Sequence, residues 1–331
     1  MSEQAPMSDA SKVRELDFSD LYLGHPGVAE RFSDVPGAPA NPLCAGPALR
    51  ADLDRLGTLC HARLIGAPAA NAFQVSHDQV NYRVTVLRAV AGLTFVLRKM
   101  AGRVESLAAL GLPQAYLHQL MARDLSGLVI VAGGVKSGKT MSACALVRDR
   151  LRAHGGVAVT GERPIELPLE GSHGQGICFQ TSMPAEPRHF AGAFRQLLRS
   201  GAQTILIDEI SDHETAVEVL QASVNGHLIV TTMLADSVVQ AVGKLQALAS
   251  HKLPAERSQA LLADGLGAVL HQQLLRGPKA MLKAELLSLK DAAAARATLR
   301  CGDHEMLASE LRRQMASMIS ANAAAQRMAA A

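Results

Sequence analysis

Two hydrophobic patterns follow one another along the 331 residues of this chain. In the first third, residues 48–65 carry leucines at helical spacing, and residues 79–100 alternate between apolar and polar side chains on both sides of Gly92. The leucine pattern predicts a helix, and the alternation predicts two strands joined by a turn. A further short helix is expected at about residues 112–123. Helix and strands together predict a small α+β unit.

From residue 127 onward, short apolar runs alternate with helical segments. This alternation predicts a parallel sheet with helices on its faces, and it places the chain in the α/β class. After Leu234 the pattern reads as almost wholly helical. The expected strands are 128–132, 157–160, 204–207 and 228–232, and the expected helices begin at residue 138 and lie around 188–199 and 214–224.

These patterns also set the boundaries of the expected parts. Residues 1–47 are rich in Pro, Gly, Ala, Ser and Asp, which predicts a disordered or poorly ordered segment with one short ordered piece at 16–23. A small α+β domain is expected over 48–110, an α/β core over 111–250, and a helical C-terminal region over 251–331.

Composition narrows the class of protein. Hydrophobic residues make up 48% of the chain and charged residues 19%, which fits a soluble globular protein with a sizeable core. The net charge of +3 and an aromatic content of only 3% argue against a nucleic-acid partner. The five cysteines never form a C-x-x-C pair, so we expect neither a zinc site nor a disulfide framework. Without a signal-peptide pattern or a long apolar run, a cytoplasmic location is expected.

A phosphate-binding loop follows the first strand of the α/β core. Its sequence, Gly-Gly-Val-Lys-Ser-Gly-Lys-Thr, fits the pattern G-x-x-x-x-G-K-[ST] between a predicted strand and a predicted helix, which is the context that the motif requires. A random chain of this length would match about one time in a hundred, given ordinary residue usage. The expected nucleotide-binding residues are Gly133, Gly134, Val135, Lys136, Ser137, Gly138, Lys139 and Thr140.

The residue types in this loop suit ATP with Mg²⁺. Glycines let the backbone curl so that several N–H groups point at phosphate oxygens, and the helix N-terminus adds its positive end. Lys139 is expected to reach the β and γ phosphates, and the hydroxyl of Thr140 is expected to ligate magnesium. ATP and Mg²⁺ are therefore the expected cofactors.

Two carboxylates end the apolar strand expected at 204–207. In ATPases with this loop, such a strand lies beside the first one and places its acids near magnesium and the attacking water. Asp208 is expected to hold the metal through water, and Glu209 to orient or deprotonate the nucleophile. The alternative is an acidic strand end that faces solvent, and the upstream loop favours the catalytic interpretation.

A second pair of carboxylates and one histidine are weaker candidates. Glu162 and Glu166 follow the strand expected at 157–160, at the sheet edge where ligands of open α/β folds bind. Taken alone, they fit a solvated loop better. His227 begins the last expected strand, and it is equally consistent with a bond to phosphate or to Glu209 and with a structural histidine.

The order and spacing of these segments resemble the secretion ATPase superfamily, which serves type II secretion, type IV pili and some type IV secretion systems. The resemblance is strongest to its pilus-retraction (PilT-like) branch, and it covers about residues 79–303, more faintly from Leu16. The four-cysteine zinc insert usual in the extension and export branches is missing from the sequence, which supports this placement. The segments that carry the resemblance are 19–23, 82–84, 97–98, 107–127, 160–166, 205–215, 226–237 and His271-Gln-Gln-Leu-Leu, the last of which resembles the start of the family's helical C-terminal region.

The resemblance implies a RecA-like motor domain preceded by a PAS-like α+β domain. It implies a homo-hexamer that binds ATP between subunits and works on an inner-membrane platform protein, so that the protein is associated with the membrane through partners. Arg83 and Arg98 would stabilise γ-phosphate charge from the neighbouring subunit, as arginine fingers do. Arg199 matches a family arginine just before the second nucleotide strand.

Four residues depart from the family pattern. Arg163 stands in place of the box aspartate, Asp208 in place of a glycine, Ser211 in place of an arginine, and Leu234 in place of a second box histidine. An arginine beside the box carboxylates would attract them and compete with magnesium.

Three functions therefore stay open. The main expectation is a pilus or secretion motor that hydrolyses ATP. The departures motivate the alternative of a catalytically weak, nucleotide-binding assembly or regulatory subunit. A DNA-translocating ATPase of related fold is disfavoured by the modest charge and the scarcity of aromatic residues.

Overall fold

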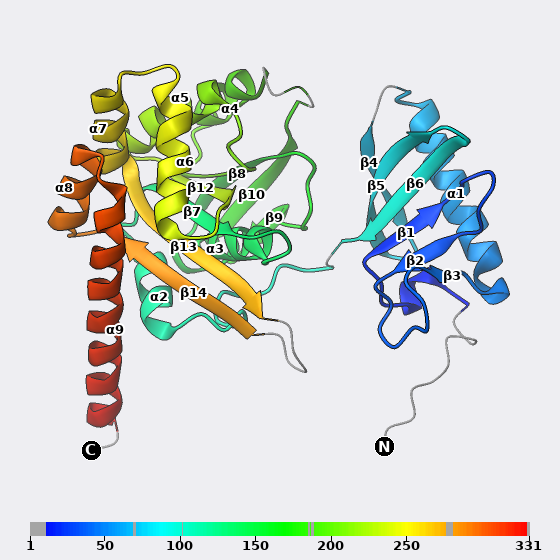
Figure 1. Ribbon diagram of the computed structural model, residues 1–331, viewed down its shortest axis with the longest axis horizontal. Helices are drawn as coiled ribbons and strands as arrows, with labels where there is room; N and C mark the ends of the chain where they lie inside the picture. Colours follow the sequence, from blue (N-terminus) through cyan, green and yellow to red (C-terminus); the bar gives the residue numbers. More distant parts are fainter. Residues whose placement is uncertain are drawn as a thin grey trace. The chain divides into compact units, whose positions relative to one another are not determined.

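The computed structural model describes residues 11–68, 71–100, 102–184, 186, 189–275 and 281–329. The chain divides into two compact units, Met1–Gly102 and Arg103–Ala331. Each unit contains its own sheet and its own hydrophobic core (Figure 1). None of the helices in this described part of the chain is both long and apolar enough to cross a membrane.

A six-stranded antiparallel sheet and one helix form the first unit. The strands lie in the order β3-β2-β1-β6-β5-β4. Tyr82, Val84 and Val86 of β5 are all buried, because alternate side chains of a strand face the same side. The predicted helix and the two predicted strands around Gly92 are confirmed. The elements are β1 (Asp20–Leu23), β2 (Arg31–Ser33), β3 (Leu43–Cys44), α1 (Arg50–Ile65), β4 (Ala72–His77), β5 (Val80–Ala89) and β6 (Gly92–Lys99).

The disorder predicted for residues 1–47 outside the ordered piece at 16–23 is wrong from Val13 onward, and the ordered piece itself contains β1; residues 1–10 lie outside the described part. The chain forms η1 (Val13–Glu15), then β1 to β3, and then η2 (Pro47–Leu49). These strands are only two to four residues long, but the first two supply fully buried core residues, Leu21 and Phe32. Prolines and glycines occupy the connections between them, so composition concealed the strands.

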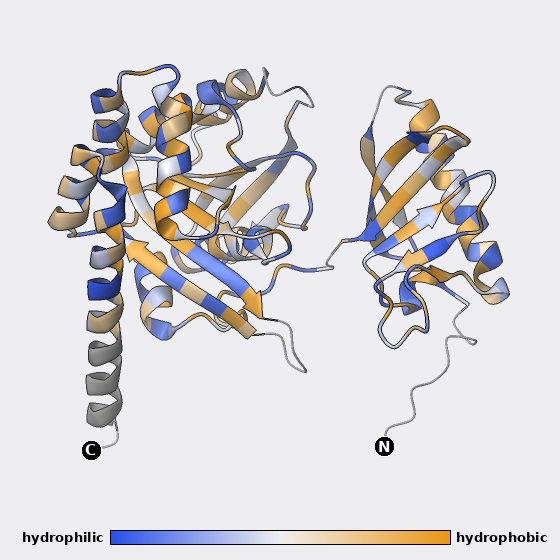
Figure 2. Cartoon of the chain, viewed as in Figure 1, coloured by the Kyte–Doolittle hydropathy of each residue, from blue (hydrophilic) through white to orange (hydrophobic). Residues whose placement is uncertain are grey.

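An eight-stranded sheet with helices on both faces forms the second unit, which confirms the α/β class. The strands lie in the order β14-β13-β7-β12-β11-β8-β10-β9, and all pairs from β13 to β10 are parallel. Figure 2 shows hydrophobic residues along the central strands. The elements are α2 (Gln114–Leu120), β7 (Gly127–Gly133), α3 (Lys139–His154), β8 (Gly156–Glu162), β9 (Gly171–His173), β10 (Gly176–Ser182), α4 (Phe190–Leu198), β11 (Thr204–Ile207), α5 (His213–Val224), β12 (Leu228–Leu234), α6 (Val238–Ser250), α7 (Ala255–Gly265), β13 (Leu266–Leu275), β14 (Met281–Ser288), α8 (Ala293–Cys301), η4 (His304–Met306) and α9 (Leu307–Ala329).

The central strand β7 is buried on both sides. Leu128 and Ile130 face a core shared with α4 to α8, whereas Val129 and Val131 face a second core shared with α2 and α3. The segment 103–112 packs into this second core, which moves the boundary between the two units from the expected residue 110 to Gly102. A strand that is buried on both faces reads as a continuous apolar run, and this is why the sequence identified it.

Two further features of the second sheet differ from expectation. The strand β11 was expected beside β7, but β12 lies between them and pairs with both. The C-terminal region was expected to be helical, but it contains β13 and β14, and β13 adds to the sheet on the other side of β7. His271 therefore lies within a strand and does not begin a helix. The apolar run Leu266–Leu270 is short enough to fit either element, and only its pairing with β7 decides for a strand.

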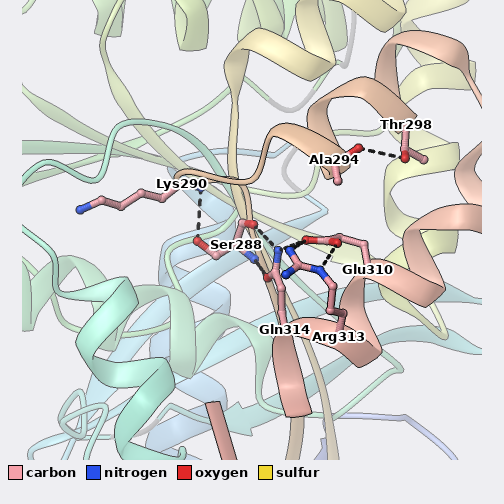
Figure 3. A network of polar contacts seen from close by, with 7 residues as sticks. All are labelled: Ser288, Lys290, Ala294, Thr298, Glu310, Arg313 and Gln314. Carbon is pink, nitrogen blue, oxygen red and sulfur yellow. Dashed lines mark hydrogen bonds and ion pairs between the residues drawn. The ribbon is translucent and has the colours of Figure 1, made fainter. Parts of the chain in front are cut away.

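The last helix, α9, is fixed to the end of β14 by side-chain hydrogen bonds (Figure 3). The side-chain amide of Gln314 donates to the carbonyl oxygen of Ser288 over 2.9 Å and accepts from its N–H over 2.9 Å. The buried Glu310 accepts from Arg313 and from Gln314 over 2.7 and 2.8 Å. The first turns of α9 therefore belong to the body of the second unit.

Candidate nucleotide site

The phosphate-binding loop connects β7 to α3 at the carboxyl edge of the second sheet. Three of its residues have positive φ angles: Gly133 at 157°, Lys136 at 60° and Gly138 at 84°. A Cβ atom on Gly133 would lie 2.3 Å from the carbonyl oxygen of Gln272 and 2.6 Å from Oγ of Ser137, so only glycine fits there. The loop conformation that the motif predicts is therefore supported by the packing around it.

Lys139 is the first residue of α3 and folds back over the loop. Its Nζ donates to the carbonyl oxygen of Gly134 over 2.7 Å. Burial lowers the pKa of Lys139, while the negative charges of Glu209 and Glu166 oppose that shift. The lysine thus lies within electrostatic range of two of the predicted catalytic carboxylates.

The carboxylates at the end of β11 are tied to the neighbouring strands. Oδ2 of Asp208 accepts from the backbone N–H of Arg163 over 3.1 Å. Oε1 of Glu209 accepts from the backbone N–H of Leu234 over 3.0 Å, and Leu234 is the register partner of Gly133. Glu209 is therefore anchored to β12, the strand that pairs with the start of the loop, although β11 itself does not pair with β7.

Asp208 is partly buried beside a second carboxylate and an arginine. Burial raises its pKa, and the charge of Glu166 adds to that shift, while hydrogen bonds from the backbone N–H groups of Glu209 and Arg163 oppose it. A partly buried carboxylate beside a second carboxylate is a suitable ligand for a divalent cation. The positive charge of the cation would offset both the burial of the carboxylate and its repulsion by the second one. Asp208 and the hydroxyl of Thr140, the second residue of α3, thus fit a magnesium site by the chemistry of their donors.

Glu162 is held more rigidly than the sequence suggested. It is 5% exposed at the end of β8, and its Oε1 accepts from Oγ1 of Thr160 over 2.6 Å and from Nε2 of Gln180 over 2.9 Å. Burial raises its pKa, against the effect of these hydrogen bonds and of one from the backbone N–H of Glu166. The interpretation of Glu162 as part of a solvated loop, which its sequence context alone favoured, is therefore wrong.

Arg163 does not simply neutralise the carboxylates around it. Its guanidinium lies over the ring of Phe190, 5.4 Å from the ring centroid. Its positive charge lowers the pKa of Asp208, although burial of Asp208 has the larger and opposite effect. The substitution of the box aspartate thus leaves the neighbouring acids in place and adds a cation–π contact to α4.

Two of the predicted site residues, His227 and Arg199, lie at the edge of the sheet opposite the phosphate-binding loop. His227 precedes β12, and its carbonyl oxygen accepts from the N–H of Gly127, which begins β7. The loop and Leu234 lie at the other end of these strands, about 20 Å away at the usual rise per residue. The prediction that His227 contacts phosphate or Glu209 is therefore wrong for its own subunit. Arg199 follows α4 and precedes β11, so it also lies at this far edge.

The two candidate arginine fingers lie in the first unit as direct neighbours. Arg83 of β5 and Arg98 of β6 are register partners across the antiparallel pair. Arg98 also donates to both carboxylate oxygens of Asp20 from Nε and from one terminal nitrogen, each over 2.8 Å. A bidentate pair of this kind orients the guanidinium. To act on a phosphate, the guanidinium of Arg98 would have to contact it while still paired with Asp20, or leave Asp20 for the phosphate.

Several residues around the loop were not expected there from the sequence. A cleft of about 330 Å³ lies beside the loop, and its lining includes Asp236, His271 and Leu274, which lie in segments that carry the family resemblance but were assigned no role at the nucleotide. Gln180 and Gln272 also escaped notice, because glutamine carries no charge and belongs to no nucleotide pattern. The only available signal was the His-Gln-Gln run, which was assigned to the wrong kind of element.

Comparison with known proteins places the chain in a family. The sequence profile of the family described as "Type II/IV secretion system protein" matches residues 68–329. The chain is 33% identical to the type II secretion system protein E of Klebsiella pneumoniae over 210 residues, and 33% identical to the type II secretion system protein HxcR of Pseudomonas aeruginosa over 210 residues. Each alignment covers 62% of this chain, but only 39% and 42% of those relatives.

Solved structures show the same fold. The pilus retraction motor PilT with bound ADP superposes with a TM-score of 0.75 at 22% identity, covering 94% of this chain and 90% of that one. The ATPase DotB of Legionella pneumophila superposes with a TM-score of 0.67 at 21% identity, covering 89% and 83%. Because the family profile spans most of the chain, from the end of the first unit through the whole second sheet, this protein belongs to the type II/IV secretion system protein family.

Proposed function

We propose that this protein is an ATP-hydrolysing motor subunit of a type IV pilus, retraction-like, or of a type II or type IV secretion system. The observation that carries the proposal is the convergence of a complete phosphate-binding loop with two anchored acids. Lys139 closes over the loop, and Glu209 is bonded to the strand residue that pairs with Gly133. Family membership supports a role in a secretion or pilus machine, and the likeness in fold to PilT supports the retraction-like branch.

The cofactors proposed are ATP and Mg²⁺. The loop amides and Lys139 would hold the phosphates, and Thr140 and Asp208 would hold the metal, which supplies charge neutralisation to phosphoryl transfer. Glu209, exposed at the sheet edge, would orient the attacking water or accept its proton, whereas the buried Glu162 is better suited to support this edge. Glu166 would add negative charge beside Lys139 and Asp208.

Assembly is the second part of the proposal. We propose a homo-hexamer, peripheral to the inner membrane, that works on a platform protein. Arg83 and Arg98 would then reach the nucleotide of a neighbouring subunit. Arg199 and His227, which lie at the edge of the sheet away from their own loop, could reach a phosphate only across such an interface.

One observation favours the alternative of a catalytically weak subunit, and another speaks against it. Arg163 lowers the pKa of Asp208 and thus competes with a cation for it. However, Leu234, which replaces the second box histidine, still binds Glu209 through its backbone N–H, a contact that does not depend on the side chain. We therefore favour the motor.

ATP turnover by the purified protein, with and without Mg²⁺, tests the proposal. Wild type should hydrolyse ATP, and Lys139→Ala should lose binding or turnover while remaining folded, because Lys139 contacts the loop and not a hydrophobic core. Lys252→Ala, at an exposed lysine paired with Glu214, serves as the control. Undiminished turnover in a folded Lys139→Ala protein would refute the site, and a wild type that binds but does not hydrolyse ATP would favour the assembly subunit.

A further inference from the structure

A glutamine from the far C-terminal side of the chain reaches the phosphate-binding loop. Gln272 lies in β13, directly opposite Gly133 in the parallel pair of β13 and β7. Its side chain is fully buried, and its Nε2 donates to the carbonyl oxygen of Ser137 over 2.7 Å. The two residues are 135 positions apart in the sequence, so this contact exists only in the folded protein.

The bond to Ser137 controls the direction of a second group. The carbonyl of Ser137 and the N–H of Gly138 belong to the same peptide unit, which is planar and trans, so the two groups point in opposite directions. When Gln272 holds the carbonyl on the side of β13, the N–H of Gly138 points away from β13. In loops of this kind the amide groups of the residues before the helix meet phosphate oxygens, and Gly138 is one of these residues by its place in the motif.

From this geometry we propose that Gln272 is a positioning residue of the nucleotide site. It holds the peptide between Ser137 and Gly138 in the orientation that presents the Gly138 N–H to phosphate. This inference rests on the proposed function, since it concerns the same loop. It adds a residue from outside the phosphate-binding loop and the strand-end carboxylates, and it makes β13 a support of the loop.

Packing shows that both the side chain and the backbone of Gln272 are closely fitted to the loop. A Cβ atom on Gly138 would lie 3.3 Å from Nε2 of Gln272, and one on Gly133 would lie 2.3 Å from the carbonyl oxygen of Gln272. Gly138 has a left-handed conformation, with φ at 84°, so the loop turns at the point where the glutamine holds it. Loss of the donor would leave a buried carbonyl without a partner and free the peptide to rotate.

The chemistry of an amide suits this position better than that of other side chains. The Ser137 carbonyl needs a donor, so an apolar residue would fail and an ionised carboxylate would repel it. A lysine or an arginine would place a second cation beside Lys139 in a buried space. A neutral amide donates without adding charge, and the shape and polarity of glutamine both fit.

The test uses the full-length protein and two phosphate probes, ATP and inorganic tripolyphosphate, in titration calorimetry. Gln272→Met keeps a similar shape but removes the donor, and it should weaken the binding of both probes by the same factor, about tenfold. Gln203→Met is the matched control: Oε1 of Gln203 accepts from the backbone N–H of Val157 over 2.9 Å at the other edge of the sheet, and its loss should not change binding. Thermal unfolding of both variants checks that they are folded.

Unchanged binding in folded Gln272→Met would overturn the inference. A loss for ATP but not for tripolyphosphate would also overturn it, because the effect would then lie at the nucleoside and not at the phosphates. If wild type binds neither probe, the proposed function fails first, so the two failures are distinguishable.

A second variant keeps the inference testable if Gln272→Met does not fold. Gln272→Glu has nearly the same shape as wild type, and its carboxyl can donate a hydrogen bond only when protonated. Its affinity for tripolyphosphate, relative to that of wild type at the same pH, should be near one at low pH and fall as the pH rises. A ratio that does not change with pH would contradict our assignment.

Discussion

The carboxylate of Glu209 and the backbone N–H of Leu234 form a hydrogen bond of 3.0 Å that joins the end of β11 to the end of β12. Leu234 in turn pairs with Gly133, at the beginning of the phosphate-binding loop. The proposed catalytic acid is thus held by the backbone of the strand that separates it from the loop. This arrangement explains how Glu209 stays in place although Leu234 departs from the family residue.

Glu209→Gln should bind ATP as wild type does and hydrolyse it at least roughly tenfold more slowly, since removal of a well-placed base costs about two to four orders of magnitude. Glutamine can still accept the bond from the Leu234 N–H, so the loop should keep its shape. Single-turnover experiments measure the hydrolysis rate, and equilibrium binding measures the affinity for ATP. Glu218→Gln, which removes only the charge that pairs with Arg195 of α4, should change neither. Equal turnover in wild type and Glu209→Gln would contradict the assigned role.

Glu162→Gln should slow turnover and yet leave the protein at least as stable as wild type at pH 7. Burial raises the pKa of Glu162 above its ordinary value of 4.5, so the folded protein holds the proton more readily than the unfolded chain. The contribution of the Glu162 carboxyl to the free energy of unfolding is fully present below pH 4.5. It is lost as the pH rises through the pKa that Glu162 has in the folded protein. A glutamine carries no charge to bury, and its oxygen can still accept from Thr160 and Gln180.

Thermal unfolding of Glu162→Gln and wild type between pH 4.5 and 8 measures this effect. The advantage of the variant should shrink as the pH falls towards 4.5. A variant that is less stable than wild type across the whole range would show that the ionised carboxylate contributes more than its burial costs.

Arg98→Ala should retain ATP binding and lose at least about tenfold in turnover, a cautious floor for an arginine finger. If the arginine acts on a neighbouring subunit, mixing Arg98→Ala with Lys139→Ala should restore part of the activity, because rings would then contain an intact loop facing an intact arginine. Light scattering with a non-hydrolysable ATP analogue should find a six-membered ring. Arg50→Ala, at an exposed arginine paired with Asp54, is the control in the same unit. A mixture as inactive as its components would argue that no arginine crosses the interface.

Asp52→Asn should destabilise the first unit by about 1–3 kcal/mol, the usual cost of unpaired buried polar groups. Asp52 is 2% exposed in α1, and it accepts from the N–H of Val13 over 2.8 Å and contacts His77 and Lys12 over 2.8 and 3.3 Å. Burial alone would raise its pKa, but these hydrogen bonds outweigh burial and lower it below 3.8.

The lowered pKa of Asp52 sets the pH window of this effect. The stabilisation is fully present above pH 3.8 and is lost as the pH falls through the folded pKa, so wild type and Asp52→Asn should converge in acid. Denaturant unfolding at pH 7 and pH 3 measures it. Asp54→Asn on the same helix, with a side chain 64% exposed, should change stability little. A constant difference at both pH values would contradict this account.

The sequence by itself determined the local features of this protein. The phosphate-binding loop is recognisable because glycines at Gly133 and Gly138, Lys139 and the following helix must stand in a fixed order along a few residues. The strands β7, β11 and β12 are recognisable because burial on both faces requires a continuous apolar run. The acids Asp208 and Glu209 follow one of these runs directly, so their place at the sheet edge could also be predicted.

Only the tertiary structure decided which distant segments meet. The order of strands, with β12 between β7 and β11 and with β13 on the far side of β7, depends on hydrogen bonds between segments that no local pattern encodes. The same holds for the edge at which His227 lies, for the pairing of Arg83 with Arg98, and for the reach of Gln272 to Ser137. Strand pairing and side-chain contacts across more than a hundred residues depend on the packing of the whole domain, and residue types along the chain carry little information about them.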